Sequence, residues 1–228
     1  MKRCLYCQEA IYLRVTWNNV VQLNSPSSLC ELCEEKLEWI EGKRCVVCSR
    51  ESPANCCYDC KRWSEFYNGK DPLIRNYSLF TYNDFMKELI TTWKYRGDYV
   101  LGTIFQDVFK QQYKKNYSFI MKQAIVLPIP LSEERLLERC FNQAAMLGQF
   151  ISNDVQIGLS RTLSEKQAKK SRFERITMKN PFKQTERLNK PVVLVDDIYT
   201  TGRTLRHAAQ LLTENGCPEV YSLTLCRA

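Results

Sequence analysis

Cysteine spacing is the feature that most constrains the fold of this 228-residue chain. Of the 12 cysteines, nine lie in the first 60 residues, and eight of these form four C-x-x-C pairs. A C-x-x-C turn brings two thiolates to one ion, and two such turns complete a closed tetrahedral site. The residues between the pairs are mostly polar, so metal binding must supply the folding energy that apolar burial cannot. The pattern predicts two structural Zn²⁺ sites, with the ligands Cys4, Cys7, Cys30, Cys33, Cys45, Cys48, Cys57 and Cys60.

The four pairs can be combined in more than one way. We favour sequential pairing, in which the first two pairs form one site and the last two form the other. Interleaved pairing, as in cross-brace modules, is the alternative. Cys56 is a further candidate that competes with Cys57, although its spacing to Cys60 fits less well. A redox dithiol or an iron–sulfur site is the other chemical interpretation, whereas four thiolates around zinc leave no open position for catalysis.

Apolar strands and helices alternate after residues 1–70, which we call the cysteine-rich segment. We expect strands near residues 73–82, 124–127, 191–195 and 221–225, and helices over 84–95, 99–115, a long stretch after Ser132, and 204–215. This alternation predicts an α/β fold with a doubly wound parallel sheet. A polar turn at 67–72 marks the boundary. The expected domains are therefore a zinc-binding module over residues 1–70 and an α/β domain over 71–228.

The stretch 192–205, VVLVDDIYTTGRTL, has the most informative chemistry. A buried strand delivers Asp196 and Asp197 to the C-terminal edge of the sheet, where α/β folds bind their ligands. A tight turn follows and leads into a helix, whose N-terminus favours an anion. We call this turn the phosphate turn, and its residues are Thr200, Thr201, Gly202, Arg203 and Thr204. Carboxylates can bind sugar hydroxyls, and the neighbouring backbone amides can bind a phosphate. This combination predicts a ribose 5-phosphate site.

Positive charge is concentrated in one segment. The formal net charge of the chain is +8, and residues 161–190 contain ten Lys/Arg against three Asp/Glu. We expect this basic segment to form a loop or hairpin that contacts a phosphate-rich partner or ligand. Candidate contacts to nucleic acid are Lys169, Lys170 and Arg172, and an aromatic-rich stretch before them adds Lys94 and Arg96 on the surface. The alternative for those aromatic residues is packing inside the protein.

The remaining composition excludes several classes of protein. No apolar run approaches the roughly 20 residues that span a bilayer, and the start of the chain lacks the apolar region of a signal peptide. We therefore expect a soluble, cytoplasmic protein without a transmembrane segment. The single histidine, His207, rules out a zinc–histidine catalytic site or a His-dependent triad and is expected to be partly exposed and non-catalytic.

These motifs together resemble a known family. VVLVDDIYTTGRT is similar to the phosphoribosyl pyrophosphate (PRPP) signature of type I phosphoribosyltransferases. Four C-x-x-C pairs ahead of such a fold resemble the ComF family, and most closely its ComFC-type late competence proteins. Shorter matching pieces are KYRGD at residues 94–98, PIPL at 128–131 and RCFNQ at 139–143. The family usually has glycine where this sequence has Cys140.

The resemblance implies roles for the matching residues. Asp196 and Asp197 would hold the ribose hydroxyls as catalytic residues, and the phosphate turn would bind the 5′-phosphate. Pro130 and Leu131 would lie at the pyrophosphate loop. The basic segment would occupy the place of the flexible loop that closes over pyrophosphate, and Mg²⁺ would arrive with PRPP.

Two functions of different classes follow from the resemblance. In the first, a competence protein aids uptake of single-stranded DNA in natural transformation and binds PRPP or a related ligand. Its partner would be a ComFA-type helicase/translocase ATPase, which would bring it to the inner face of the cytoplasmic membrane. In the second, the protein is an active phosphoribosyltransferase with an unidentified acceptor. Release of pyrophosphate from PRPP, with DNA and the partner present or absent, distinguishes the two.

Overall fold

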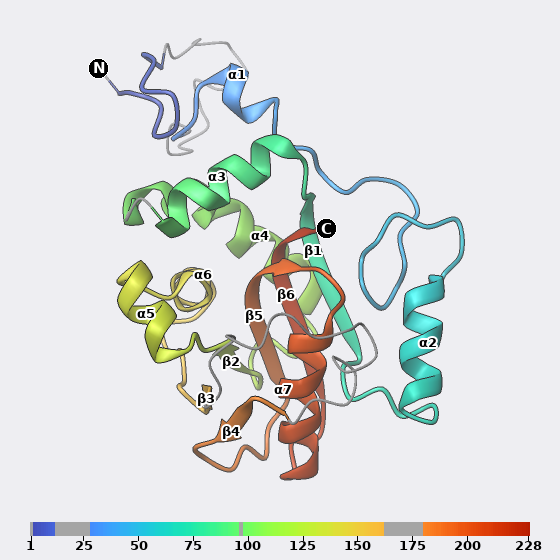
Figure 1. Cartoon of the computed structure of the whole chain (residues 1–228). Helices are drawn as coiled ribbons and strands as arrows, with labels where there is room; N and C mark the ends of the chain where they lie inside the picture. Colours follow the sequence, from blue (N-terminus) through green and yellow to red (C-terminus); the bar gives the residue numbers. More distant parts are fainter. Residues whose placement is uncertain (1, 12–27, 96–97, 162–179) are drawn as a thin grey trace.

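The structure is a computed structural model of the chain and describes residues 2–11, 28–95, 98–161 and 180–228 (Figure 1). Within these residues, four strands form a parallel sheet in the order β1-β6-β5-β2, and two more form the antiparallel pair β3-β4. No helix in this described part is both long and apolar enough to cross a bilayer. In chain order the elements are α1 (Glu31–Glu34), α2 (Tyr58–Phe66), β1 (Arg75–Thr81), α3 (Asp84–Tyr95), the 3₁₀ helix η1 (Tyr99–Phe105), α4 (Gln106–Tyr117), β2 (Ile125–Pro128), α5 (Glu133–Arg139), α6 (Gln143–Ile151), β3 (Leu159–Arg161), β4 (Phe182–Gln184), β5 (Val192–Tyr199), α7 (Arg203–Glu214) and β6 (Val220–Arg227).

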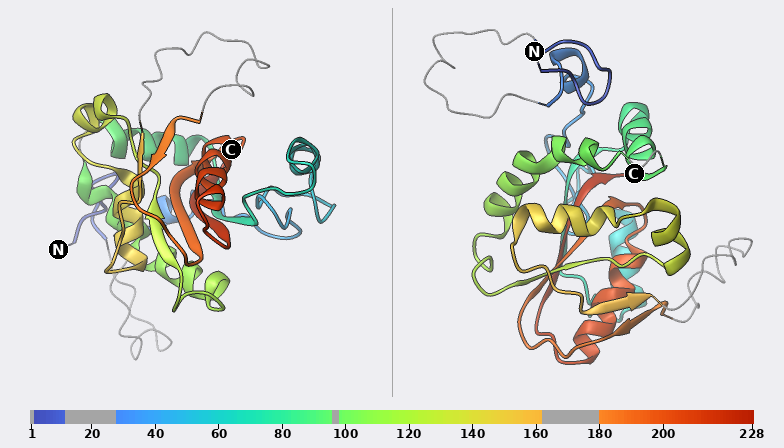
Figure 2. Two further views of the ribbon diagram at one scale, coloured as in Figure 1. Left: turned by 90° about the horizontal axis from the view of Figure 1, so that it is seen from below. Right: turned by 90° about the vertical axis from the view of Figure 1, so that its left-hand side faces the viewer.

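Helices cover both faces of the parallel sheet, as the doubly wound pattern predicts (Figures 1 and 2). The inner strand β5 pairs with β6 on one side, where Val192 lies opposite Val220, and with β2 on the other. Val193 and Val195 face the core formed with α3, α4 and α6, whereas Val192 and Leu194 face α7. Because strand residues alternate between faces, this apolar run is buried on both sides.

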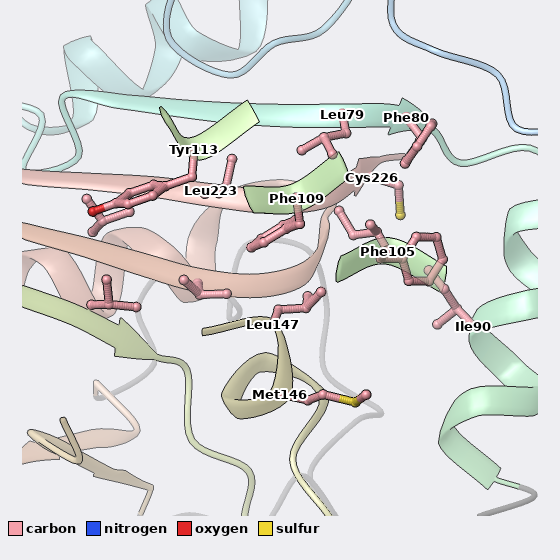
Figure 3. Close-up of a cluster of buried hydrophobic side chains, with 14 of the residues drawn as sticks. Leu79, Phe80, Ile90, Phe105, Phe109, Tyr113, Met146, Leu147, Leu223 and Cys226 are labelled. Atoms are coloured by element: carbon pink, nitrogen blue, oxygen red, sulfur yellow. The ribbon is translucent and has the colours of Figure 1, made fainter. Parts of the chain in front are cut away.

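The larger core fills the space between the sheet and helices α3, α4 and α6 (Figure 3). Phe105 and Phe109, from η1 and α4, are fully buried and lie close to Leu223 of β6 and Leu147 of α6. Ile90 brings α3 into the same cluster. The end of α3, at Lys94, and the start of α6, after Asn142, thereby lie at the C-terminal edge of the strands, where the sequence predicts a ligand site.

Two helices that the sequence predicts as continuous are interrupted. The stretch 99–115 begins as η1 and becomes α-helical only in α4. The long helix expected after Ser132 is wrong, because Cys140 adopts φ 62° and ψ −10° and thereby ends α5. A new helix, α6, starts after Asn142. Ser132 does cap α5, since its hydroxyl oxygen accepts a hydrogen bond from the backbone N–H of Arg135 at 3.4 Å.

Residues 38–49 run along the outer edge of β1. The N–H of Ile40 donates to the carbonyl oxygen of Leu79 at 3.0 Å, and the N–H of Asn76 donates to the carbonyl oxygen of Val47 at 2.7 Å. The hydroxyl of Ser49 donates to the carbonyl oxygen of Asn76 at 2.9 Å. The cysteine-rich segment is therefore hydrogen-bonded to the α/β fold and not merely tethered to it.

Candidate functional site

The structure gathers the eight paired cysteines into two clusters, in the sequential combination. The first Cys4 cluster is Cys4, Cys7, Cys30 and Cys33, and the second Cys4 cluster is Cys45, Cys48, Cys57 and Cys60. Within each cluster the Sγ atoms all lie within 4.8 Å of one another. The four cysteines of the second cluster are buried, whereas Cys7 of the first is exposed. Each cluster could hold a metal ion, and Cys56 belongs to neither group.

The sulfur spacing fits tetrahedral thiolate ligation. With a Zn–S distance of about 2.3 Å, a regular tetrahedron has S···S edges of about 3.8 Å. The Sγ atoms of Cys7 and Cys30 are 3.6 Å apart, and those of Cys48 and Cys57 are also 3.6 Å apart. Both separations are far longer than a disulfide bond, and these cysteines are free thiols. The donor sets of both clusters therefore fit zinc.

The acidic pair lies within β5, because this strand continues to Tyr199 and not only to the predicted end at Val195. Each carboxylate accepts a hydrogen bond of 2.9 Å from the next backbone N–H: Asp196 from Asp197, and Asp197 from Ile198. Burial and the neighbouring charge of Asp197 raise the pKa of Asp196 to about 8. The Asp196 carboxyl therefore holds its proton near neutral pH when no ligand is bound.

Lys94, at the end of α3, contacts this pair. Its ammonium group lies against Oδ2 of Asp197, and both side chains are only 13% exposed. The positive charge of Lys94 lowers the pKa of Asp196 and so opposes the effect of burial. The expectation that Lys94 is a surface cation is wrong, because α3 ends above the C-terminal edge of the sheet and its last turn directs this side chain towards β5.

The phosphate turn joins β5 to α7. Gly202 has φ 73° and ψ 10° and is the N-cap residue of α7, which begins at Arg203. A Cβ atom at Gly202 would overlap the hydroxyl of Tyr199 and the guanidinium of Arg206, so only glycine fits. The open backbone N–H groups of a helix start favour an anion here. The threonines at this turn are Thr200 and Thr201, which are exposed, and Thr204, which is half-buried.

The loop after β2 lies at the same edge of the sheet. Pro130 and Leu131 are half-buried in this loop. The side-chain amide of Asn142 donates to the carbonyl oxygen of Ile129 at 3.0 Å, and its oxygen accepts from the N–H of Ala144 at 2.9 Å. Asn142 therefore joins the start of α6 to the loop that follows β2.

Arg139 is a buried cation beside this loop, with 6% of its surface exposed. Its guanidinium lies 5.3 Å from the ring centre of Tyr95 and donates to the Tyr95 hydroxyl and to Oε1 of Gln143, both at 3.4 Å. Among the described residues, Nε of Arg139 and Nε2 of Gln143 have no hydrogen-bond partner. Buried donors are rarely left unpaired. Two such donors near the loop after β2 are consistent with a site that receives acceptor atoms of a ligand.

Comparison with known proteins agrees with these features. Residues 140–228 match the family described as phosphoribosyl transferase domain. The chain is 36% identical over 229 residues to competence protein ComFC of Bacillus subtilis (strain 168), covering 99% of this chain and 95% of that protein. It is 30% identical over 230 residues to competence protein ComFC of Streptococcus pneumoniae, covering 99% and 100%. The chain belongs to the ComFC family.

A shorter similarity relates this ComFC-family chain to DNA utilization protein YhgH of Escherichia coli O157:H7. The two are 34% identical over 114 residues, which covers 45% of this chain and 48% of that protein. Together with the parallel sheet, the domain match confirms the phosphoribosyltransferase-like fold that the sequence predicts.

The structure explains the glycine that is usual in the family at the position of Cys140. Cys140 is in the left-handed region of backbone conformation, with φ 62°, which glycine adopts without steric cost. The side chain of Cys140 is exposed, so it does not displace a neighbour. In this chain, the break between α5 and α6 therefore has a backbone conformation that favours glycine.

The predicted nucleic-acid residues of this ComFC-family protein lie mainly outside the described residues: Arg96, Lys169, Lys170 and Arg172. Most of the basic segment lies outside the described residues, and its first residue, Arg161, pairs antiparallel with Phe182. His207 is half-buried, and burial with the nearby charges of Arg203 and Arg161 lowers its pKa to about 4. This histidine is therefore neutral at pH 7.

Sequence reasoning did not find the ion pair of Lys94 with Asp197 or the contact of Arg139 with Tyr95. A signal was present in the motifs themselves, because Lys94 and Tyr95 belong to the KYRGD piece and Arg139 to the RCFNQ piece. Two short motifs of an α/β chain that both follow apolar stretches can meet at one edge of the sheet. Their partners, however, follow only from the packed structure.

Proposed function

We propose that this protein is a cytoplasmic competence protein that aids uptake of single-stranded DNA in natural transformation and binds PRPP at the phosphate turn. The observation that supports the role most strongly is the similarity, over 99% of the chain, to two proteins named competence protein ComFC. A ComFA-type helicase/translocase ATPase is the proposed partner. This partner would bring the protein to the inner face of the cytoplasmic membrane.

Each part of the proposed PRPP site has a physical reason. Gly202 adopts the left-handed backbone conformation with which the turn enters α7, and the backbone amides of this helix start would bind a phosphate. Asp196 and Asp197 offer oxygens to the ribose hydroxyls, and Lys94 balances their charge. The unpaired donors of Arg139 and Gln143 would hydrogen-bond to pyrophosphate oxygens. Mg²⁺, a hard cation that prefers carboxylate and phosphate oxygens, would be held between Asp196, Asp197 and the ligand.

Titration calorimetry with PRPP and Mg²⁺ tests this site. Asp197→Ala removes a carboxylate from the ribose and should weaken binding by about 1–3 kcal/mol in a folded protein. Asp107→Ala is the matched control, because Asp107 is an exposed carboxylate on α4. Unchanged affinity in a folded Asp197→Ala variant would contradict the ribose site.

The two cysteine clusters are proposed to hold one structural Zn²⁺ each. The sulfur separations and the four thiolates of each cluster support zinc over a catalytic metal, because they leave no open coordination position. The ions would stabilise the fold of the cysteine-rich segment and take no part in chemistry.

Binding of single-stranded DNA is proposed for the basic segment. Binding should weaken steeply with salt, with a log–log slope of roughly −0.7 per phosphate contacted. Replacing Lys169, Lys170 and Arg172 by alanine should reduce the magnitude of the slope by about 2. The matched control removes the same charge from α4 through the exposed lysines Lys110, Lys114 and Lys115. Absence of binding at low salt, even with the partner ATPase present, would exclude this role.

The second candidate function is phosphoribosyl transfer, and the partly buried acidic pair at the proposed ribose site favours it. A nucleophilic atom of the acceptor would form a bond to C1 of the ribose. The C1–oxygen bond to pyrophosphate would break, and pyrophosphate would leave with the electron pair. Measured release of pyrophosphate that requires a DNA or base acceptor would support turnover, whereas binding of PRPP without release would support the adaptor role.

A further inference from the structure

Arg206 connects the cysteine-rich segment to the phosphate turn. This arginine, on α7, is completely buried. Its Nε and Nη2 donate to Oδ2 of Asp71 at 3.0 Å and 2.9 Å. Its Nη1 donates to the hydroxyl of Tyr199 at 2.7 Å and to the carbonyl oxygen of Gly202 at 3.4 Å. One buried guanidinium therefore binds Tyr199 just before the turn, Gly202 in the middle of the turn, and Asp71 just after the cysteine-rich segment.

Trp63 makes a second connection. It lies on α2, and its indole Nε1 donates to the carbonyl oxygen of Thr201 at 3.0 Å. The guanidinium of Arg206 lies 4.8 Å from the ring centre of Trp63. Because the carbonyl and the N–H of a planar peptide point in opposite directions, this bond directs the N–H of Gly202 away from α2. An anion bound by that N–H would therefore lie on the side of the turn opposite α2.

The position of α2 depends on the second Cys4 cluster. Cys57 is the N-cap residue of α2, and Cys60 lies in its first turn. The helix has nine residues, and a helix this short is not stable in water without tertiary support. The cysteines of this cluster also share one hydrophobic core with Tyr199 and Leu205, which flank the phosphate turn. Metal at this cluster would therefore fix the helix from which Trp63 reaches the turn.

The first Cys4 cluster contacts a different part of the fold. The hydroxyl of Tyr6 donates to Glu88 at 2.9 Å, and the Tyr6 ring packs edge-on against Phe85, with 5.0 Å between the ring centres. Both partners lie on the first half of α3, and Figure 1 shows α1, which includes Cys33, beyond α3 and apart from α7. The two clusters thus support different elements.

We infer that the second Cys4 cluster positions the phosphate turn through Trp63 and the Asp71–Arg206 ion pair. This inference rests on the proposed binding of PRPP. Trp63 is a positioning residue, because it acts through its contact with the turn. Affinity for PRPP then depends on metal at the second cluster and not on metal at the first.

The sharpest test is Trp63→Phe, which removes the indole N–H and retains an aromatic ring over Arg206. Loss of one hydrogen bond should weaken PRPP binding about 2- to 12-fold in calorimetry, with two zinc ions still bound. Trp39→Phe is the matched control, since Trp39 is 42% exposed and packs on Phe80 of β1. Affinity of Trp63→Phe equal to that of the wild type would overturn the inference.

Cysteine variants test the dependence on the metal. Cys57→Ser and Cys7→Ser should each lower the zinc content to about one ion per chain. Only Cys57→Ser should abolish PRPP binding, and Cys7→Ser should bind within about twofold of the wild type. An equal loss in both variants would show that general destabilisation, and not positioning of the turn, links the cluster to the ligand.

Hydrogen exchange separates failure of this inference from failure of the proposed function. If the wild-type protein does not bind PRPP, the proposed site is wrong, but the amides of residues 200–204 still report on the turn. Trp63→Phe and Cys57→Ser should then exchange these amides faster than the wild type, and Cys7→Ser should not. Unchanged exchange in Trp63→Phe would refute the positioning role without reference to any ligand.

Discussion

The ammonium group of Lys94, at the end of α3, lies against Oδ2 of Asp197, near the end of β5. This lysine also lowers the pKa of the adjacent Asp196, which burial and the charge of Asp197 raise to about 8. A residue from a distant part of the chain therefore opposes the effect of burial on the charge of the acidic pair.

Replacing Lys94 by methionine should change the pH dependence of PRPP binding. Without the lysine, Asp196 holds its proton to a higher pH, so binding with Mg²⁺ at pH 7 should weaken about tenfold for each pKa unit gained. The loss of affinity should be smaller at pH 9, because a larger fraction of the carboxyl is ionised there. Calorimetry at both pH values measures the effect, with Lys87→Met as the control, because Lys87 is an exposed lysine on the same helix. The same loss at pH 7 and pH 9 would contradict this explanation.

Asp196→Asn should stabilise the ligand-free protein at alkaline pH. Below the ordinary value of 3.8 the folded and unfolded chains both hold this proton, and between 3.8 and about 8 only the folded chain does. The contribution of Asp196 to the free energy of unfolding therefore falls as pH rises, by up to about 1.4 kcal/mol per pH unit.

Thermal unfolding measured between pH 4 and pH 8 tests the direction of this pH dependence. The melting temperature of Asp196→Asn should equal that of the wild type near pH 4 and exceed it at pH 8. Asp107→Asn, on the exposed face of α4, should show no such divergence. Parallel curves for Asp196→Asn and the wild type would show that burial does not raise this pKa.

Purified protein should contain two zinc ions per chain, and a chelator should remove them in order. The exposed thiol of Cys7 gives a chelator access to the first cluster, whereas the four cysteines of the second are buried. Elemental analysis after graded chelation should show one ion lost before the other, with the α/β fold retained at the first step. A metal content of one ion or none would contradict the two-site assignment.

Gly202→Ala should abolish PRPP binding and lower stability. Gly202 has φ 73°, and a Cβ atom there would also overlap Tyr199 and Arg206. Gly42→Ala is a close control, because Gly42 has φ 68° and a Cβ atom there would meet nothing within 4 Å. Backbone strain alone costs about 1–2 kcal/mol. Chemical unfolding should show a larger loss for Gly202→Ala, and equal losses would mean that the turn can accommodate a side chain.

Features that depend on short-range spacing were predictable from the sequence. The phosphate turn follows its strand directly, so the acidic pair, Gly202 and the helix start are placed by local geometry. The cysteine pairs are local in the same sense, and the clusters formed in the favoured combination. The alternation of strands and helices gave the sheet and its two covered faces.

Features that depend on packing were not predictable. The break at Cys140 lies in a stretch rich in helix-forming residues, and the local pattern there predicts one continuous helix. Arg206 lies among the buried apolar positions of α7, and this spacing in the sequence indicates that Arg206 is buried too. The pairing of Arg206 with Asp71 could not be predicted, because an ion pair between residues far apart in the chain produces no repeating pattern in the sequence.

The hydrogen bonds between residues 38–49 and β1 have a consequence for solubility. β1 is an edge strand, and an uncovered edge strand can pair with the same strand of another molecule. The segment 38–49 occupies that edge from Asn76 to Leu79. A chain truncated ahead of β1 would expose this row of backbone groups, so the cysteine-rich segment also protects the protein from edge-to-edge aggregation.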